Sequence, residues 1–228
     1  MPTLVHSPLC PHSRFVRLIL AEYGVEAQLI EERAADRRRE FLELDPAGRT
    51  PVLIDDDGTV VPGAGVIAEY LDETRGALQD GRRLFPDDPR GRVEMRRLVD
   101  WFNVKFFDEV SNWLVTEKVA KRYAASSASA PDMDVLRVAR ANLRPHLRYL
   151  GYLTGTRKWL AGERLTCADF AAAAHLSVAD YLGDVPWAED EHAKHWYQRV
   201  KSRPAFRVLL ADRLPGMAPG PFYAELDF

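Results

Sequence analysis

The sequence predicts an α/β domain at the N-terminus followed by an all-α domain. Strand-like and helix-like patterns alternate over residues 1–74, whereas every periodic segment after residue 89 has helical spacing. The segment between them, residues 75–89, is rich in Gly, Asp, Arg and Pro and has little periodicity, which is typical of a linker. We therefore expect an N-terminal domain, a linker, a helical domain and a tail over residues 1–78, 79–89, 90–213 and 214–228.

The first domain reads as strand, helix, strand, helix, then two strands and a helix. A helix is expected to end at Gly24, because glycine adopts the left-handed conformation that follows a helix. The run Asp55-Asp56-Asp57-Gly58 reads as the turn of a hairpin. The order predicts a small mixed sheet flanked by helices. The expected strands are 3–6, 27–30, 51–54 and 59–61, and the expected helices are 13–23, 36–44 and 65–73.

The second half contains helical patterns only. The expected helices are 88–123, 132–153, 168–182, 190–201 and 204–212, with a Ser/Ala loop over 124–131. Pro145 is expected to kink the second of these helices.

The tail, residues 214–228, holds three prolines and cannot continue a helix, yet it is apolar. We expect it to pack on the first domain and to display Asp227 as part of a protein-binding surface.

Composition limits the function. The chain has 228 residues, of which 46% are hydrophobic and 29% charged, as in ordinary globular proteins. A net charge of −3 argues against a nucleic-acid binder. The two cysteines, Cys10 and Cys167, are expected to be free thiols in a reducing compartment. Neither a signal peptide nor an apolar run long enough to cross a membrane is found, so we expect a cytoplasmic protein with no membrane insertion.

The segment Cys10-Pro11-His12-Ser13-Arg14 is the main candidate for chemistry. A thiol at a helix N-terminus is near free backbone N–H groups, which favour the thiolate. Arg14, one turn further on, is expected to add positive charge. The alternative is that Cys10 is only a small residue in a tight turn between strand and helix, and the sequence leaves both interpretations open.

Two further motifs are interpreted as structural, and a pair of histidines is not interpreted as a metal site. Pro51 lies in Ala47-Gly48-Arg49-Thr50-Pro51-Val52-Leu53, and Thr166-Cys167-Ala168-Asp169 has the form of a capping box. His192 and His195 have helical spacing but no evident third ligand, so no metal is expected.

These motifs together resemble the cytosolic glutathione transferase family. The resemblance rests on the Cys10 segment, the Pro51 segment, the Thr166–Asp169 box and Arg203-Pro204-Ala205-Phe206, and it covers residues 3–210. It implies a thioredoxin-like first domain, a helical second domain and a cis peptide bond before Pro51.

The resemblance also implies where glutathione would bind. In the family an acidic residue followed by serine, just before the third helix, holds the γ-glutamyl end of glutathione. This chain has Gly63-Ala64 there. Each lost charge-assisted contact costs about 1.5–3 kcal/mol. We therefore expect feeble or no glutathione binding, no cofactor and no enzyme activity, with Cys10 as a vestigial catalytic candidate.

A basic strip is the main surface candidate. Arg137, Arg140, Arg144 and Arg148 share one helical face, and Lys118, Lys121 and Arg122 could extend it. The strip is either a solvated face or a docking surface for an acidic protein. The aromatic residues Trp101, Phe102, Phe106, Phe107 and Trp113 read mostly as core, although a cleft lined by them could hold a ligand.

A narrower resemblance concerns the opening of the chain, the Gly63-Ala64 region and the ending Phe222-Tyr223-Ala224-Glu225-Leu226-Asp227-Phe228. These segments are similar to glutathione-transferase-like proteins of bacterial cell division. The resemblance implies a non-enzymatic homodimer at the division site that binds FtsZ polymer, promotes curved or bundled filaments and regulates constriction through septal wall synthesis. The contact residues expected are Phe222, Tyr223, Leu226, Asp227, Phe228, Lys118, Lys121, Arg122, Arg137 and Arg140. The alternative is a Cys10-dependent glutathione transferase or thiol reductase, and a small-molecule carrier ranks last.

Overall fold

The structure is a computed structural model that describes residues 1–79, 81–124 and 129–228. Its first domain is a mixed four-stranded sheet in the order β2-β1-β3-β4, as the sequence predicts. β1 is parallel to β2 and antiparallel to β3, which is antiparallel to β4. The strands are β1 (Thr3–His6), β2 (Gln28–Glu31), β3 (Val52–Ile54) and β4 (Val60–Pro62).

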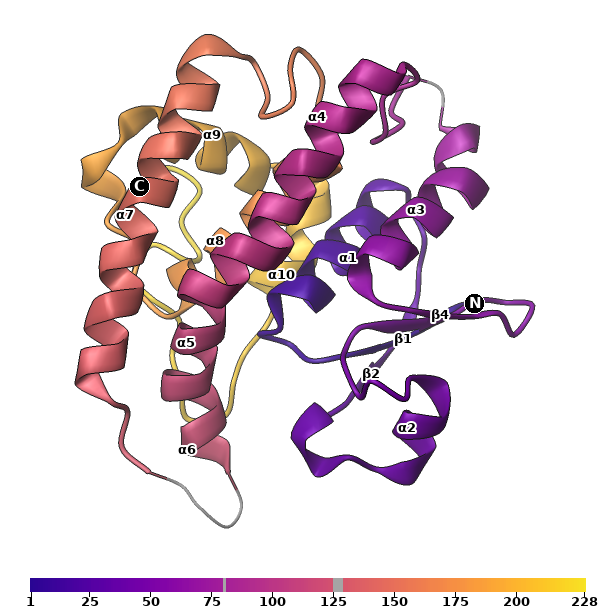
Figure 1. Cartoon of the computed structure of the whole chain (residues 1–228), viewed down its shortest axis with the longest axis horizontal. Helices are drawn as coiled ribbons and strands as arrows, with labels where there is room; N and C mark the ends of the chain where they lie inside the picture. The colour runs from indigo at the N-terminus through magenta and orange to yellow at the C-terminus, as the bar shows by residue number, and fades with distance from the viewer. Residues whose placement is uncertain (80, 125–128) are drawn as a thin grey trace.

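Helices cover both faces of this sheet because the central strands point apolar side chains to both faces. Leu4 and Leu53 belong to the main core with α1 and α3, whereas Val5 and Val52 pack on Phe41 of α2. Figure 1 shows α1 and α3 on one side of the sheet and α2 on the other. The bounds are α1 (Pro11–Glu22), α2 (Arg39–Leu44) and α3 (Ala64–Thr74).

The helix expected over residues 36–44 is wrong in its first part. A 3-10 turn, η1 (Ala34–Asp36), ends at Arg37, whose φ of 44° lies in the left-handed region. A non-glycine residue at this φ interrupts a right-handed helix. The chain therefore starts a new helix, α2, only after Arg38.

The second domain begins with the expected long helix, but that helix changes type along its length. Wider π-type turns follow α4 (Pro89–Asp100), as η3 (Trp101–Ser111), and recur as η4 (Thr116–Ala120). Between and after them lie α5 (Asn112–Val115) and α6 (Lys121–Tyr123). Residues 125–128, half of the loop predicted to follow, lie outside the described residues.

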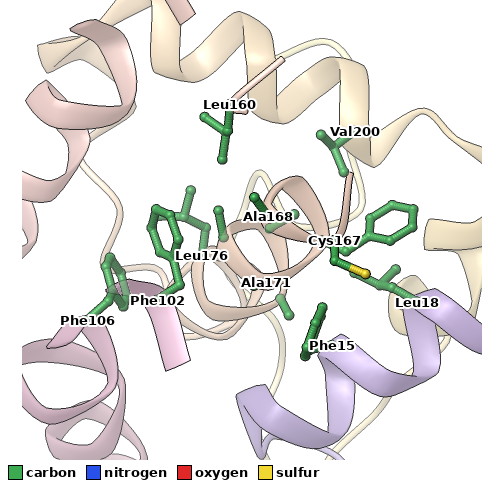
Figure 2. Close-up of a cluster of buried hydrophobic side chains, with 14 of the residues drawn as sticks. Phe15, Leu18, Phe102, Phe106, Leu160, Cys167, Ala168, Ala171, Leu176 and Val200 are labelled. Carbon is green, nitrogen blue, oxygen red and sulfur yellow. The ribbon is translucent and has the colours of Figure 1, made fainter. Parts of the chain in front are cut away.

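The remaining helices close around a central one. α8 (Cys167–Tyr181) is buried along its whole length, which explains its run of alanines. In Figure 2, Phe15 and Leu18 of α1 lie beside Ala171 and Cys167 of α8, so that the two domains share a core. The other elements are α7 (Met133–Thr156), which contains Pro145, α9 (Glu191–Lys201), α10 (Arg207–Leu210) and the short turns η2 (Gly76–Leu78), η5 (Trp187–Glu189) and η6 (Pro204–Phe206). The helix expected over 204–212 is thus a 3-10 turn followed by one short α-helical segment.

The tail packs mainly on the helical domain and makes few contacts with the first domain. The expectation that it packs on the first domain is therefore largely wrong. Phe228 lies against Trp187, with its ring tilted by 56° to the indole, and its edge meets Tyr197. Tyr223 joins Tyr181 and Leu9 in a small separate core, and Leu9 belongs to the first domain. Aromatic side chains drive this docking because the second domain offers aromatic partners. No helix in the described part of the chain is long and apolar enough to cross a membrane.

Candidate functional site

Cys10 precedes the first turn of α1, where the sequence predicts it. It occupies the N-cap position with an extended backbone, and Pro11 begins the helix. Its Sγ lies 3.7 Å from the carbonyl oxygen of Thr50. The Thr50–Pro51 peptide bond is cis, as the family resemblance implies. The thiol therefore faces the loop that Pro51 shapes.

His12, not Arg14, is the side chain that acts on the thiol. Nε2 of His12 donates to the carbonyl oxygen of Asn103 at 2.9 Å, so when the ring is protonated its other N–H, at Nδ1, is left to donate to the Cys10 thiolate. Burial alone raises the pKa of Cys10, but hydrogen bonds from His12 and Ser13 and the charge of His12 outweigh it and lower this pKa to about 7. The sequence contained this signal, because His12 stands two residues after Cys10.

The role expected for Arg14 is wrong. Its guanidinium is completely buried and donates to Ser177 at 2.8 Å, to Tyr223 at 3.1 Å and to Asp212 at 2.9 Å. Because these partners all lie in the second domain and the tail, Arg14 joins the domains instead of charging the thiol.

A cavity of about 490 Å³ separates α3 from the long helix near this site. Ala64 and Gly65 line one side, and His12 and Asn103 line another. Gly63, with a φ of 89°, precedes α3 and offers no side chain to cap it. The cavity thus has no carboxylate or hydroxyl at the two positions where the family holds glutathione.

Most cations of the predicted basic strip have acidic partners within the chain. Lys118 and Arg140 share Asp184, at 2.6 and 2.8 Å. Similar pairs join Lys121 to Glu117, Arg137 to Asp134 and Arg144 to Glu189. Arg122 donates to the carbonyl oxygen of Gly216 at 2.6 Å. This pairing favours the solvated interpretation of the strip, and its use for docking stays a prediction.

The predicted contact residues of the tail divide into two groups. Tyr223 is completely buried, so it cannot touch a partner, and this part of the prediction is wrong. Its hydroxyl donates to the carbonyl oxygen of Leu209 at 2.6 Å. Phe222, Leu226 and Asp227 are exposed, and Phe228 is half-buried. Tyr223 and Phe228 hold the tail on the body, and the exposed side chains around them form the available surface.

Sequence reasoning missed the group that fixes this tail. Lys201 of α9 is 1% exposed, and its Nζ donates to the carbonyl oxygen of Phe222 at 2.6 Å and to Asp180 at 3.2 Å. The ammonium also lies over the ring of Phe228, 4.5 Å from its centroid. Burial lowers the pKa of Lys201, and the Asp180 carboxylate partly offsets this effect. No local pattern marks a lysine at the end of an amphipathic helix as buried.

The structural motifs are confirmed. Thr166 and Asp169 form the predicted capping box at the start of α8. Asp169 also accepts from Trp196 at 2.9 Å and from the backbone of Leu160 at 3.0 Å, which satisfies a fully buried carboxylate. Within residues 1–79, 81–124 and 129–228, no group of His, Cys, Asp and Glu could hold a metal ion.

Comparisons with known proteins agree with this geometry. Models of the glutathione S-transferase N-terminal and C-terminal domains match residues 4–79 and 119–204. FtsZ-localized protein A of Caulobacter vibrioides is 46% identical over 99% of this chain and 98% of its own. The solved structure of FzlA from C. crescentus has a TM-score of 0.93 over 100% and 99% of the two chains, at 46% identity. A glutathione S-transferase from Sinorhizobium meliloti 1021 matches with a TM-score of 0.97 and 50% identity over the whole of both chains. The two family models and the full-length relatives show that the chain belongs to the glutathione S-transferase family.

Proposed function

We propose that this protein binds FtsZ filaments at the division site as a scaffold without enzyme activity. The observation that carries the proposal is the 46% identity to FtsZ-localized protein A over nearly the whole of both chains. The similarity includes the tail, which the two family models do not reach. A retained tail supports a shared role beyond the transferase fold.

The cavity beside α1 supports the absence of transferase activity. Gly63 and Ala64 replace the acidic residue and serine that the family resemblance implies, so the γ-glutamyl group of glutathione would lose both polar partners. Glu69 does line the cavity, but Arg96 holds it at 2.8 Å. Asp100 lines the cavity as well, but neither carboxylate stands at the two positions just before α3 that the resemblance assigns to glutathione.

We further propose that the scaffold acts as a homodimer. A dimer presents two identical filament-binding faces, which is the simplest way to bundle or curve filaments. Its action on constriction would then pass to the septal wall-synthesis machinery. Sedimentation equilibrium of the purified protein tests the dimer, and a mass of 25.8 kDa at micromolar concentration would contradict it.

The first experiment is co-sedimentation with FtsZ assembled in GTP at moderate salt. We expect the protein to pellet with polymer and to remain in the supernatant when GDP replaces GTP. Pelleting in neither condition would overturn the proposal. Electron microscopy of the same samples shows whether filaments are curved or bundled.

Charge reversals then test the basic strip, and the ion pairs in the structure show which reversals leave the fold undisturbed. Arg137 is mostly exposed and, within the described part of the chain, pairs only with exposed Asp134, so Arg137→Glu should leave folding intact. Arg140 instead pairs with Asp184, whose side chain is 1% exposed, so its reversal also strains the fold. Loss of pelleting with Arg137→Glu at an unchanged melting temperature would assign the strip to filament binding. Normal pelleting would remove it from the contact surface.

A second candidate function rests on the position of Cys10 at the N-cap of α1, 3.7 Å from the Thr50 carbonyl oxygen, where its pKa is lowered to about 7. A thiolate at a helix start, paired with His12, suits a glutathione transferase or a thiol reductase. Retention on immobilised glutathione that Cys10→Ser abolishes would support it. No retention, with no turnover of a disulfide substrate, would exclude it.

A further inference from the structure

The outer edge of β2 is open. The N–H groups of Gln28 and Glu32 donate inward, to the carbonyl oxygens of Pro2 at 2.9 Å and His6 at 2.8 Å. Successive residues of a strand point their N–H and C=O groups to opposite edges. The N–H and C=O groups of Leu29 and Glu31 therefore face outward. Among the described residues β2 pairs only with β1, and all four of its side chains are exposed.

An apolar groove lies beside this edge. It has a volume of about 520 Å³, and Leu29 forms part of its wall. Met1, Leu29 and Val208 are exposed there, by 74%, 46% and 37%. Arg17 and Glu26 also line the groove.

Among the described residues that line this groove, Arg17 is the one buried ion. Its side chain is 6% exposed, and its two terminal nitrogens are held by Asp212 and the carbonyl oxygen of Val208. Nε is buried and has no hydrogen-bond partner within the described residues.

The charge of the edge indicates what would bind. Glu26 and Glu31 are exposed near its two ends. A second copy would bring another Glu26 and another Glu31 to the same edge, and like charges brought close together repel each other. A basic segment would instead meet these carboxylates with opposite charge.

We propose that the outer edge of β2 and its groove bind an extended, basic segment of another protein as an added strand. The backbone of the segment pairs with Leu29 and Glu31, one of its apolar side chains enters the groove, and its lysines or arginines face Glu26 and Glu31. Strand addition of this kind draws affinity from main-chain hydrogen bonds and specificity from a side-chain pocket. The proposal goes beyond filament binding and does not depend on it.

The test uses amide hydrogen exchange, read by NMR on the full chain. The probe is the synthetic peptide Lys-Thr-Val-Ile-Val-Thr-Lys at millimolar concentration. We expect exchange at the amides of Leu29 and Glu31 to slow by about tenfold or more, which corresponds to about 1.4 kcal/mol of protection. Gln28 is the internal control, because its N–H already donates to Pro2 and its protection should not change.

Two altered peptides and a variant pair separate this mode from non-specific binding. A peptide with proline at its centre lacks the required N–H, and one with glutamates in place of the lysines has the wrong charge, so both should fail. Leu29→Asp should abolish the protection at Glu31, whereas Val66→Asp, at an exposed position of α3, should preserve it. Equal protection by the acidic peptide, or none by the basic one, would overturn the proposal. A third outcome would also overturn the proposal. If the amides of Leu29 and Glu31 were already protected in the free protein, and Leu29→Asp removed both this protection and a dimer, a second copy of the chain would occupy the edge.

Discussion

Arg14 of α1 donates to the hydroxyl of Tyr223 in the tail, 209 residues further along the chain, at 3.1 Å. The same hydroxyl donates to the carbonyl oxygen of Leu209 in α10. The guanidinium is completely buried, and Asp212 neutralises it at 2.9 Å. One tyrosine thus joins the first helix, the last helix and the tail, which makes the tail a structural part of the body.

Replacing Tyr223 by phenylalanine should therefore destabilise the whole protein. The variant keeps the ring but leaves one donor of buried Arg14 and the carbonyl oxygen of Leu209 without this partner. An unsatisfied buried group costs about 1–3 kcal/mol, and we expect a loss of that size in the free energy of unfolding by urea. Tyr152→Phe is the matched control, because Tyr152 is 68% exposed and should change stability by less than about 0.5 kcal/mol. Equal effects of the two variants would contradict the network.

Lys201→Met should release the end of the tail. The variant keeps much of the packing volume but removes the donor to the Phe222 carbonyl oxygen and leaves the Asp180 carboxylate buried without its cation. Removing one partner of a buried pair costs about 3–5 kcal/mol. We expect faster amide exchange in the tail and altered fluorescence of Trp187, which lies against Phe228. Lys194→Met removes a half-exposed lysine near Phe228 and should leave both signals almost unchanged.

The fold could be predicted from the sequence because its signals are local. Short extended runs and turn residues located the strands, and Thr166 with Asp169 located the start of α8. The left-handed Arg37 that divides the second helix region carries no comparable signal, since arginine rarely adopts that conformation.

The candidate site could be predicted only in part, because some of its contacts join residues that are distant in sequence. The position of Cys10 follows from its motif, but the direction of Arg14 depends on Ser177 and Asp212, which are distant in sequence. The acidic partners of the basic strip, such as Asp184 for Arg140, are hidden in the same way. Long-range ion pairs arise from tertiary packing, and no periodicity within one helix reports them.

The reactivity of Cys10 should follow a pKa near 7. Only the thiolate attacks an alkylating agent, so the rate with iodoacetamide should rise with pH and reach half its maximum near pH 7. His12→Ala removes the hydrogen bond and charge that lower this pKa, so the midpoint should move upward toward the ordinary range of a free thiol. Cys167 is completely buried, and burial raises its pKa, so Cys10→Ser should abolish the reaction. An unchanged midpoint in His12→Ala would show that His12 does not act on the thiol.

The exposed end of the tail should carry a partner contact that can be removed without unfolding the protein. Asp227 is exposed while Phe228 beside it is anchored, so Asp227→Lys changes the charge of a fixed surface and leaves its docking intact. We expect an unchanged melting temperature and a loss of function in dividing cells, seen as slowed constriction.

Co-sedimentation with FtsZ polymer then locates the defect. Loss of pelleting assigns the tail to the filament, whereas normal pelleting with slow constriction assigns it to the wall-synthesis machinery. Glu73→Lys, which reverses an exposed carboxylate of α3, should have neither effect. Normal pelleting together with normal constriction in Asp227→Lys would remove the tail from both interactions, because a charge reversal at the centre of a contact cannot be silent.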